Sequence, residues 1–377
     1  MAKNPLETTT TSQPILPARY QDQERIFARA FQILSDAIAA RAFPGASVAV
    51  THAGELVALK AFRQFTYDND SPRVTTNTVF DLASVSKVAA TTTMAMVLYE
   101  RGLLDLDTRV VGVLPEFRGS DQRRNEVTIR HLLAHSSGLP AYEKLFLRAS
   151  NRDDLLMGAF AVPLKHAPGT HAEYSDVGFV LLGLALERLA GEELDGFCQR
   201  EIFGPLGMSH TTYNPSPAWK PQIPPTADDQ TFRKRVIQGE VNDENASVMG
   251  GVAGHAGVFS TASDLATFAH AMLQGGTQIV RPATVALFTR RELSPAGTSR
   301  ALGWDTPSAP SQSGKYFSSR SFGHLGYTGT SLWIDAERQI SITLLTNRTW
   351  PDSSNKAITE IRPRFHDAVM EALGVGA

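Results

Sequence analysis

The chain has 377 residues, enough for two domains of ordinary size or one large domain with a full hydrophobic core. Its 36 Lys and Arg residues nearly balance its 38 Asp and Glu residues, so the net charge of -2 excludes a global attraction to nucleic acid or anionic lipid. The single cysteine, Cys198, excludes an internal disulfide and a four-thiolate metal site.

The N-terminal residues contain no apolar run of the length that a signal peptide requires. We therefore predict a disordered leader over residues 1–19 and favour a cytoplasmic location, although the compartment stays open. The longest apolar stretch, residues 177–186, is shorter than the ~18 residues that cross a bilayer, so we expect no membrane span.

The sequence predicts a helix over residues 23–41 and then a β-hairpin over residues 46–61, which turns at Ala53 and Gly54. Further along, apolar residues recur with helical periodicity in segments separated by loops rich in Pro and Gly. These segments are residues 88–101, 129–134 and 176–190.

Near the C-terminus, residues 328–335 and 339–346 are β-rich, and residues 353–373 form an amphipathic pattern typical of a closing helix. Strands at both ends with helices between them predict an α/β fold with an inserted, mostly helical domain. We place the α/β domain at residues 20–85 together with 245–377, and the inserted domain at residues 86–244.

The reaction class depends on the pattern Ser-x-x-Lys, which on a helix places a lysine amine close enough to a serine hydroxyl to exchange a proton. Chance predicts on the order of 0.7 such pairs in this composition, and the chain contains Ser84 with Lys87 and Ser353 with Lys356. We interpret Ser353 as the N-cap of the closing helix, with Lys356 facing water. Ser84 and Lys87 lie between apolar segments, where a buried lysine amine favours its neutral form. The alternative there is an N-cap serine beside a lysine that reaches solvent.

Two other segments carry candidate site residues. Tyr174 lies in a turn-rich loop that leads into an apolar helix, where a loop could present its hydroxyl to a cleft; packing on the core is the alternative. The segment from Phe322 to Thr330 places glycines, including Gly326, at the start of a strand, as expected where backbone approaches a ligand or forms a bulge.

These three segments follow each other at separations of about 90 and about 150 residues, and stretches 127–140 and 250–261 accompany them. Together they resemble the serine β-lactamase and penicillin-binding-protein superfamily, in particular its class C-like branch and the family VIII carboxylesterases. The likeness extends from about residue 25 to 373. It implies a β-lactamase-like fold: an antiparallel sheet flanked by helices, plus an inserted helical domain.

The resemblance also implies roles for residues. Ser84 corresponds to the acylated nucleophile, Lys87 to its activating partner and Tyr174 to the tyrosine that shuttles the proton. His324 and Gly326 would line the site, and the backbone N–H groups of Ser84 and Tyr327 would form the oxyanion hole. Such acyl transfer needs no cofactor and no metal, and whether Lys87 or Tyr174 is the general base stays open.

Two departures bear on the substrate. Relatives that act on β-lactams and peptidoglycan carry Asn and Lys where this chain has Asp176 and His324. In those relatives Asn and Lys bind the amide and the carboxylate of the substrate, so we expect this chain to bind a penicillin-like substrate more weakly. We therefore expect a carboxylesterase acting on short-chain esters, with weak β-lactamase activity. The alternatives are a β-lactamase, a D-amino-acid peptidase, an amidase or a transacylase, or a non-catalytic member that binds peptides. A further hypothesis is that Asp176 keeps Lys87 protonated and makes Tyr174 the base.

Other readings of the sequence are weaker. His131 and His135 have the spacing of a zinc pair on a helix, but no glutamate or third ligand accompanies them. Asp243, Glu244 and His255 are interpreted as loop structure. No serine has the glycines of the α/β-hydrolase elbow. The expected partner is a small ester or β-lactam-like molecule rather than nucleic acid, and the oligomeric state is not indicated. Tyr142 and Phe146 are lid candidates.

Overall fold

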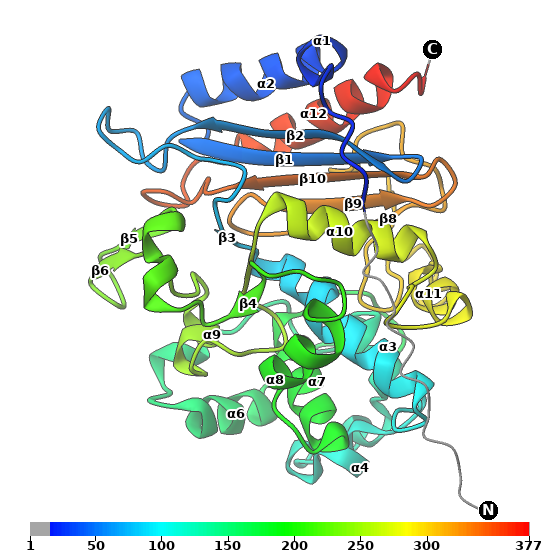
Figure 1. Ribbon diagram of the computed structural model, residues 1–377. Helices are drawn as coiled ribbons and strands as arrows, with labels where there is room; N and C mark the ends of the chain where they lie inside the picture. The colour runs from blue at the N-terminus through cyan, green and yellow to red at the C-terminus, as the bar shows by residue number, and fades with distance from the viewer. Residues whose placement is uncertain (1–15, 377) are drawn as a thin grey trace, which may run out of the picture.

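The computed structural model describes residues 16–376, and its centre is a five-stranded antiparallel sheet (Figure 1). The strands lie in the order β2-β1-β10-β9-β8. Their bounds are β1 Gly45–His52, β2 Glu55–Arg63, β8 Phe322–Leu325, β9 Ser331–Asp335 and β10 Ile340–Thr346. The sheet therefore joins segments from both ends of the chain, which confirms the fold class that the sequence predicted.

The β1–β2 hairpin turns where the sequence predicted. Ala53 and Gly54 have φ values of 49° and 85°, the left-handed conformation that a tight two-residue turn requires. On its other edge β1 pairs with β10, with Ala49 opposite Thr343. Because β1 lies between two neighbours and is buried along nearly its whole length, it anchors the sheet.

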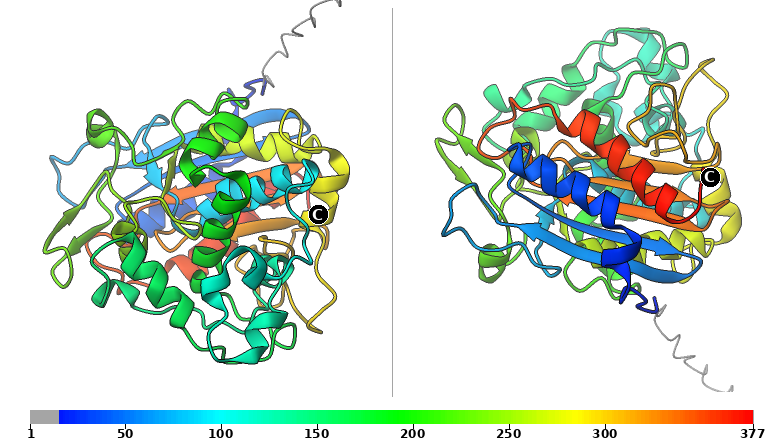
Figure 2. Two further views of the ribbon diagram at one scale, coloured as in Figure 1. Left: turned by 90° about the horizontal axis from the view of Figure 1, so that it is seen from below. Right: turned by 90° about the horizontal axis from the view of Figure 1, so that it is seen from above.

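Helices cover both faces of the sheet (Figure 2). On one face α2 (Ala28–Ala39), preceded by α1 (Gln23–Ile26), lies beside α12 (Ile358–Ala372). On the other face α10 (Ala262–Leu273) packs against β1, β9 and β10. The buried residues of α2 recur three or four positions apart, as in Phe31, Leu34 and Ile38, so one stripe of this helix faces the sheet.

The chain between β2 and β8 is mainly helical. Its α-helices are α3 Thr93–Glu100, α4 Val110–Val113, α5 Ile129–Leu133, α6 Arg152–Ala161, α7 Asp176–Ala190, α8 Leu194–Cys198, α9 Glu244–Val248, α10 and α11 Pro282–Thr289. Short strands form two small sheets: β3 Phe80–Asp81, β7 Val258–Ser260 and β4 Thr212–Tyr213 in one, and β5 Ala227–Asp229 with β6 Arg235–Ile237 in the other. The two-domain division stays a prediction.

The closing helix begins later than predicted. It starts at Ile358, so Ser353 lies outside it and is not its N-cap. The intervening residues form turns instead, because the Asp352 side chain accepts a hydrogen bond from the Ser354 N–H and the Asn355 side chain accepts one from the Ala357 N–H. Short polar side chains therefore compete here with the helix that the apolar periodicity predicts.

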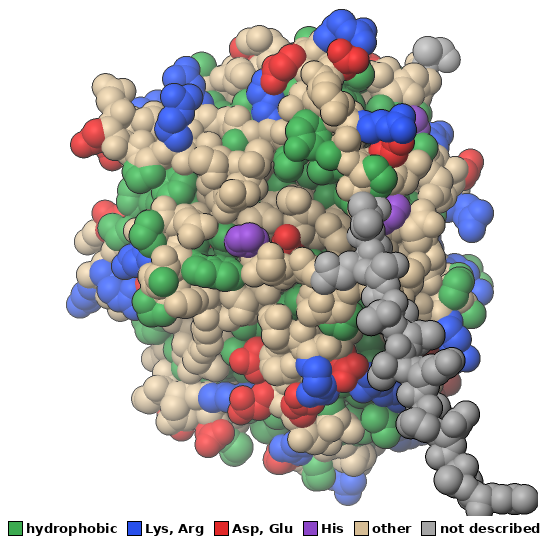
Figure 3. Space-filling model, viewed as in Figure 1, with side chains coloured by type: hydrophobic (Ala, Val, Ile, Leu, Met, Phe, Trp, Pro, Cys, Tyr) green, Lys and Arg blue, Asp and Glu red, His purple; other side chains and the backbone are tan. Residues whose placement is uncertain are grey.

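The predicted leader lies mostly outside the described residues. Its last residues run along β2, where the Arg19 N–H donates to the Leu56 carbonyl at 2.8 Å. No helix of the described chain is long and apolar enough to cross a membrane. Acidic and basic side chains are interspersed over the face shown in Figure 3, in keeping with the near-zero net charge.

Candidate active site

Ser84 lies in a tight turn between β3 and the helix that carries Lys87. The turn is the 3-10 segment Ala83–Val85, and Ala83 adopts a φ of 47°, a conformation that L residues rarely populate. The Asp81 carboxylate holds this turn by accepting the Ala83 N–H at 2.8 Å and the Asn242 N–H at 2.6 Å. The serine is thus presented by backbone that its neighbours hold in place.

The helix after this turn opens with a π-helical stretch, Lys87–Thr92, before α3. The sequence predicts an ordinary helix here, and π-helical turns are common at functional sites because they change side-chain direction. The Lys87 side chain is fully buried, and its Nζ lies 2.9 Å from Ser84 Oγ. The alternative of a lysine that reaches solvent is therefore wrong.

Tyr174 approaches the same serine from a loop of the helical region. Its hydroxyl donates to Ser84 Oγ at 2.7 Å. Ser175 caps the following helix α7 by accepting the Gly178 N–H, which fixes the end of the loop directly after the tyrosine. The Lys87 amine and the Tyr174 hydroxyl, which come from two separate segments of the chain, thus both contact Ser84 Oγ.

Three acceptors surround the Lys87 amine. Besides Ser84 Oγ, they are the His255 carbonyl at 2.8 Å and Asp176 Oδ1 at 2.6 Å. The protonated amine has three N–H groups, whereas the neutral amine has two and a lone pair that can accept the proton of Ser84. Burial lowers the pKa of Lys87, whereas the charge of Asp176 opposes that shift.

The protonation state of Tyr174 is set by its surroundings. Burial, and after it the negative charge of Asp176, raises the pKa of Tyr174 well above its usual value. The resting phenol is therefore protonated near neutral pH. The phenol can donate this proton to another group only if it receives a proton in return, for example from Ser84.

Two neutral histidines flank the tyrosine. The ring of His135 lies 4.7 Å from that of Tyr174, and the ring of His324 lies 5.9 Å away. Burial lowers the pKa of His324 to about 3 and that of His135 well below its usual value. His324 is therefore uncharged at neutral pH, so the strand edge offers a substrate no positive charge at that position.

Strand β8 ends against the turn that carries Ser84. Added at Gly326, a Cβ would lie 1.9 Å from Thr330 Oγ1 and 2.5 Å from the Leu82 carbonyl oxygen, so only glycine fits. The hydroxyls of Thr328 and Thr330 also donate to the Asp81 and Leu82 carbonyls, each at 2.8 Å. These contacts hold the backbone around residue 327 next to the turn that carries the serine.

A cavity of about 1150 Å³ opens over these groups, and Ser84, Tyr174 and Asp176 line it. Its wall also includes charged side chains from several elements: Lys144, Asp228, Arg233, Glu244, Arg348 and Arg362. Tyr142 and Phe146, the predicted lid residues, line it as well. The volume exceeds that of a typical small-ligand pocket, about 300–1,000 Å³.

Comparison with known proteins identifies the family of the chain. The family model described as Beta-lactamase matches residues 30–363. The chain belongs to the Beta-lactamase family. Members of this family are serine hydrolases, and the structure has their fold, as the sequence resemblance implied.

Among curated Beta-lactamase relatives, "N-acetylmuramyl-L-alanine amidase" of Bacillus subtilis is 32% identical over 348 residues, or 82% of this chain and 78% of the relative. "Putative D-alanyl-D-alanine carboxypeptidase" of Escherichia coli is 34% identical over 307 residues, or 73% and 70%. The solved structure of "EstCE1, a hydrolase with promiscuous acyltransferase activity" superposes with a TM-score of 0.76 at 22% identity, covering 92% of this chain and 99% of that one. This last similarity establishes the fold alone.

Two parts of this Beta-lactamase site differ from what the sequence predicts. The first is His255, which was assigned to loop structure but holds Lys87 through its backbone carbonyl, while its ring binds Asp243 at 2.8 Å. A backbone contact leaves no pattern in the side chains, so the sequence held no signal for it. The second is His135, which has a φ of 53°, lies outside α5 and packs on Tyr174. It therefore does not form the zinc pair with His131 that the spacing allowed.

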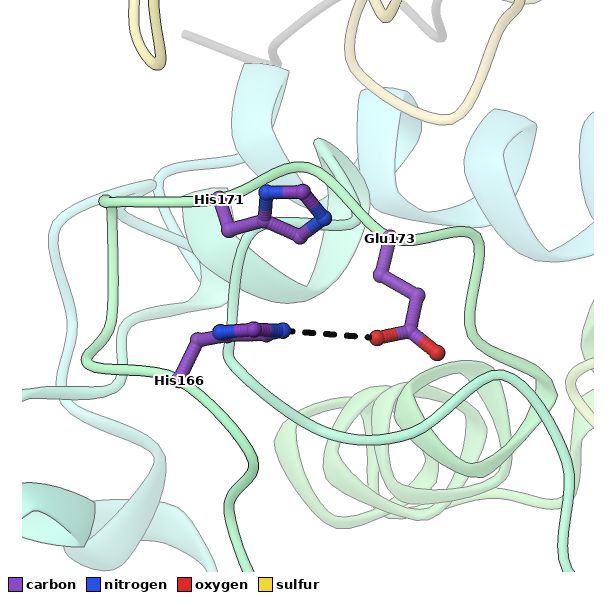
Figure 4. A group of neighbouring side chains, drawn as sticks. All are labelled: His166, His171 and Glu173. Carbon is purple, nitrogen blue, oxygen red and sulfur yellow. Dashed lines mark ion pairs between the residues drawn. The ribbon is translucent and has the colours of Figure 1, made fainter.

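A cluster of metal-ligand types does occur in the loop before Tyr174 (Figure 4). Ligand atoms of His166, His171 and Glu173 lie within 4.8 Å of one another. The Glu173 carboxylate, however, already accepts from Lys165 Nζ at 3.0 Å and from the Ala141 N–H at 3.1 Å. Because Lys165 neutralises its charge and its oxygen binds a backbone N–H, we assign Glu173 to holding the loop that carries Tyr174.

Proposed function

We propose that the protein is a serine acyl hydrolase that forms an acyl ester at Ser84 and cleaves polar amide substrates of the N-acetylmuramyl-peptide class. The observation that carries the acyl-transfer mechanism is the meeting of Lys87 Nζ and the Tyr174 hydroxyl at Ser84 Oγ, at 2.9 and 2.7 Å. The enzyme class rests on that geometry, and the substrate class on the cavity and the relatives.

In the proposed mechanism Ser84 Oγ attacks the substrate carbonyl carbon, and its proton passes into the Lys87–Tyr174 pair. The backbone N–H groups of Ser84 and Tyr327 stabilise the oxyanion of the tetrahedral intermediate. The Tyr174 hydroxyl then donates a proton to the leaving nitrogen, so that an amine departs and the acyl group stays on Ser84. Water, deprotonated by the same pair, attacks the ester and regenerates the serine.

Two observations favour amides of this class. Of the two relatives described above, one is named an N-acetylmuramyl-L-alanine amidase and the other a putative D-alanyl-D-alanine carboxypeptidase, and each alignment covers more than two thirds of this chain. In addition, a cavity of about 1150 Å³ with charged walls suits a large polar substrate, whereas a short-chain ester would leave most of it unfilled.

Carboxylester hydrolysis is the second candidate, and it rests on the two departures at Asp176 and His324. A carboxylate only accepts hydrogen bonds, and His324 is neutral, so both groups grip the amide and carboxylate of a β-lactam less well than Asn and Lys do. The preference for short-chain esters stays a prediction. Esters also react more easily than amides, so they are convenient probes of either function.

The decisive experiment measures kcat/KM for an N-acetylmuramyl dipeptide, short p-nitrophenyl esters and a chromogenic cephalosporin on one preparation, with fluorophosphonate labelling of Ser84 in parallel. We expect labelling at Ser84 and release of the peptide amine. Labelling with ester turnover but no amide cleavage would leave the esterase candidate. A much larger kcat/KM on the cephalosporin would contradict both candidates, and an unlabelled Ser84 would indicate a binding protein.

A further inference from the structure

Two buried arginines line the same cavity beside the end of β8, and no Asp or Glu of the described chain acts on either of them. Arg348 follows β10 and is 6% exposed. Its Nε donates to the Tyr327 carbonyl at 2.7 Å, and its Nη1 lies 3.2 Å from the carbonyls of Ser353 and Asn355. All of these acceptors are neutral.

Arg362 projects from α12 and is 3% exposed. Its Nη1 donates to the Gln312 side-chain oxygen at 2.5 Å, and its Nη2 donates to the Thr330 carbonyl at 3.2 Å. The third nitrogen, Nε, is buried, and its N–H has no hydrogen-bond partner. This guanidinium therefore has both an uncompensated charge and an unused donor.

Burial, together with the nearby charge of Arg348, lowers the pKa of Arg362 to about 9. Buried charges are normally paired, because removing an ion from water is costly and neutral dipoles compensate only part of that cost. Arg233 illustrates the usual arrangement, since it lines the cavity but pairs with Asp229 at 3.2 Å. Arg124 is also buried and donates to backbone carbonyls, but it lies outside this cavity, and the negative charge of Asp121 acts on it.

We propose that Arg348 and Arg362 form a subsite for a carboxylate of the substrate. A planar guanidinium matches the two oxygens of a carboxylate, and two such groups facing one cavity provide the missing counter-charge only when the ligand is bound. Because His324 is neutral, this residue supplies no positive charge to the cavity, whereas the two buried arginines do. This subsite rests on the proposed function and narrows its substrates to acidic ones.

The test compares substrates that differ only in a carboxylate. One series uses p-nitrophenyl monoesters of dicarboxylic acids of increasing length. Each is compared with the same ester in which the free carboxylate is converted to a primary amide, which probes the acyl side of the substrate. A second pair, N-acetylmuramyl-L-alanyl-D-glutamate and its D-isoglutamine analogue, probes the leaving-group side. In at least one arm we expect kcat/KM to be about tenfold or more higher for the compound with the additional carboxylate.

The variants Arg348→Gln and Arg362→Gln are expected to bring this ratio close to one, whereas Arg364→Gln, at an exposed arginine of the same helix, keeps it. If a Gln variant fails to fold, the Lys variant at the same position replaces it. It is expected to lower the ratio of kcat/KM values several-fold, because lysine keeps the positive charge but lacks the paired N–H donors of a planar guanidinium. Equal rates within every wild-type pair would overturn the subsite, as would a ratio that persists in both variants. Absence of turnover for all compounds would instead contradict the proposed function.

Discussion

The two Ser-x-x-Lys pairs of this chain have the same spacing but different environments. In the first pair the fully buried Lys87 amine lies 2.9 Å from Ser84 Oγ. In the second pair Lys356 is exposed, and its amine donates to the Ser353 backbone carbonyl at 2.9 Å instead of to the hydroxyl. Both serines line the large cavity, so access to the cavity does not distinguish them.

The difference shows that burial and neighbouring groups, rather than spacing, hold a lysine amine at a serine hydroxyl. Lys87 is enclosed by an ion pair with Asp176 and by the His255 carbonyl, so its amine is held at the serine. Burial also lowers the pKa of Lys87, which favours the neutral amine that can accept a proton from Ser84. Lys356 is exposed, and its amine bonds a backbone carbonyl rather than the hydroxyl of its serine.

Replacing Ser84 by Ala is the change expected to have the largest effect. The hydroxyl that forms the acyl ester is removed, so we expect turnover of every ester and amide to fall about 10⁴-fold or more. Steady-state kinetics and fluorophosphonate labelling check this, with a melting curve to show that the variant is folded. Residual activity close to that of wild type would place the nucleophile elsewhere.

Replacing a proton-transfer partner is expected to cost less, because the nucleophile stays in place. Tyr174→Phe removes the hydroxyl that donates to Ser84, and Lys87→Met removes the amine, so we expect losses of about 10²–10⁴-fold in kcat/KM. Tyr99→Phe, at an exposed tyrosine, is the matched control. A loss below about threefold in both site variants would contradict the shared proton relay.

Asp176→Asn addresses which partner is the base. The charge of Asp176 raises the pKa of both Lys87 and Tyr174, so removing it is expected to lower both. If neutral Lys87 is the base, the acidic limb of the pH–rate profile shifts to lower pH. If a Tyr174 phenolate acts beside a protonated Lys87, the acidic limb, set by Tyr174, shifts to lower pH as well, and the alkaline limb, where Lys87 loses its proton, shifts in the same direction.

The profiles are measured as kcat/KM on a p-nitrophenyl ester, since this quantity reports the pKa values of the free enzyme. Asp153→Asn, at an exposed position of α6, controls for the change in net charge. We expect a loss of about tenfold at neutral pH besides the shift. An unchanged profile would contradict the role of Asp176 in setting these pKa values.

Much of the fold could be predicted because apolar periodicity survives in the local sequence. The hairpin at Ala53 and Gly54 and helix α7 appear where the pattern placed them. The helix after Ser353 begins late because Asp352 and Asn355 form side-chain turns that periodicity does not register. Local pattern thus located elements better than it located their ends.

The site shows the same limit more sharply. Ser84, Lys87 and Tyr174 could be named because each carries a reactive side chain in a recognisable segment. The π-helical turn after Ser84 and the carbonyl of His255 that holds the amine could not, since both depend on backbone geometry fixed by distant packing. The sequence also could not predict that Arg362 is buried with a donor that has no partner, because the partners of a side chain are set by the folded chain.

The smallest effect is expected for Ser353→Ala, the counterpart of the Ser84 variant. The contacts of this residue with Lys356 and Arg348 use its backbone carbonyl, which alanine retains, and its hydroxyl does not cap α12. We therefore expect kcat/KM and the melting temperature to stay close to wild type, with changes in stability within about 0.5 kcal/mol. Both variants are measured on the same substrates. A loss of activity in Ser353→Ala as large as that in Ser84→Ala would contradict the assignment of Ser84 as the nucleophile, because the Ser353 hydroxyl has no part in the proposed reaction.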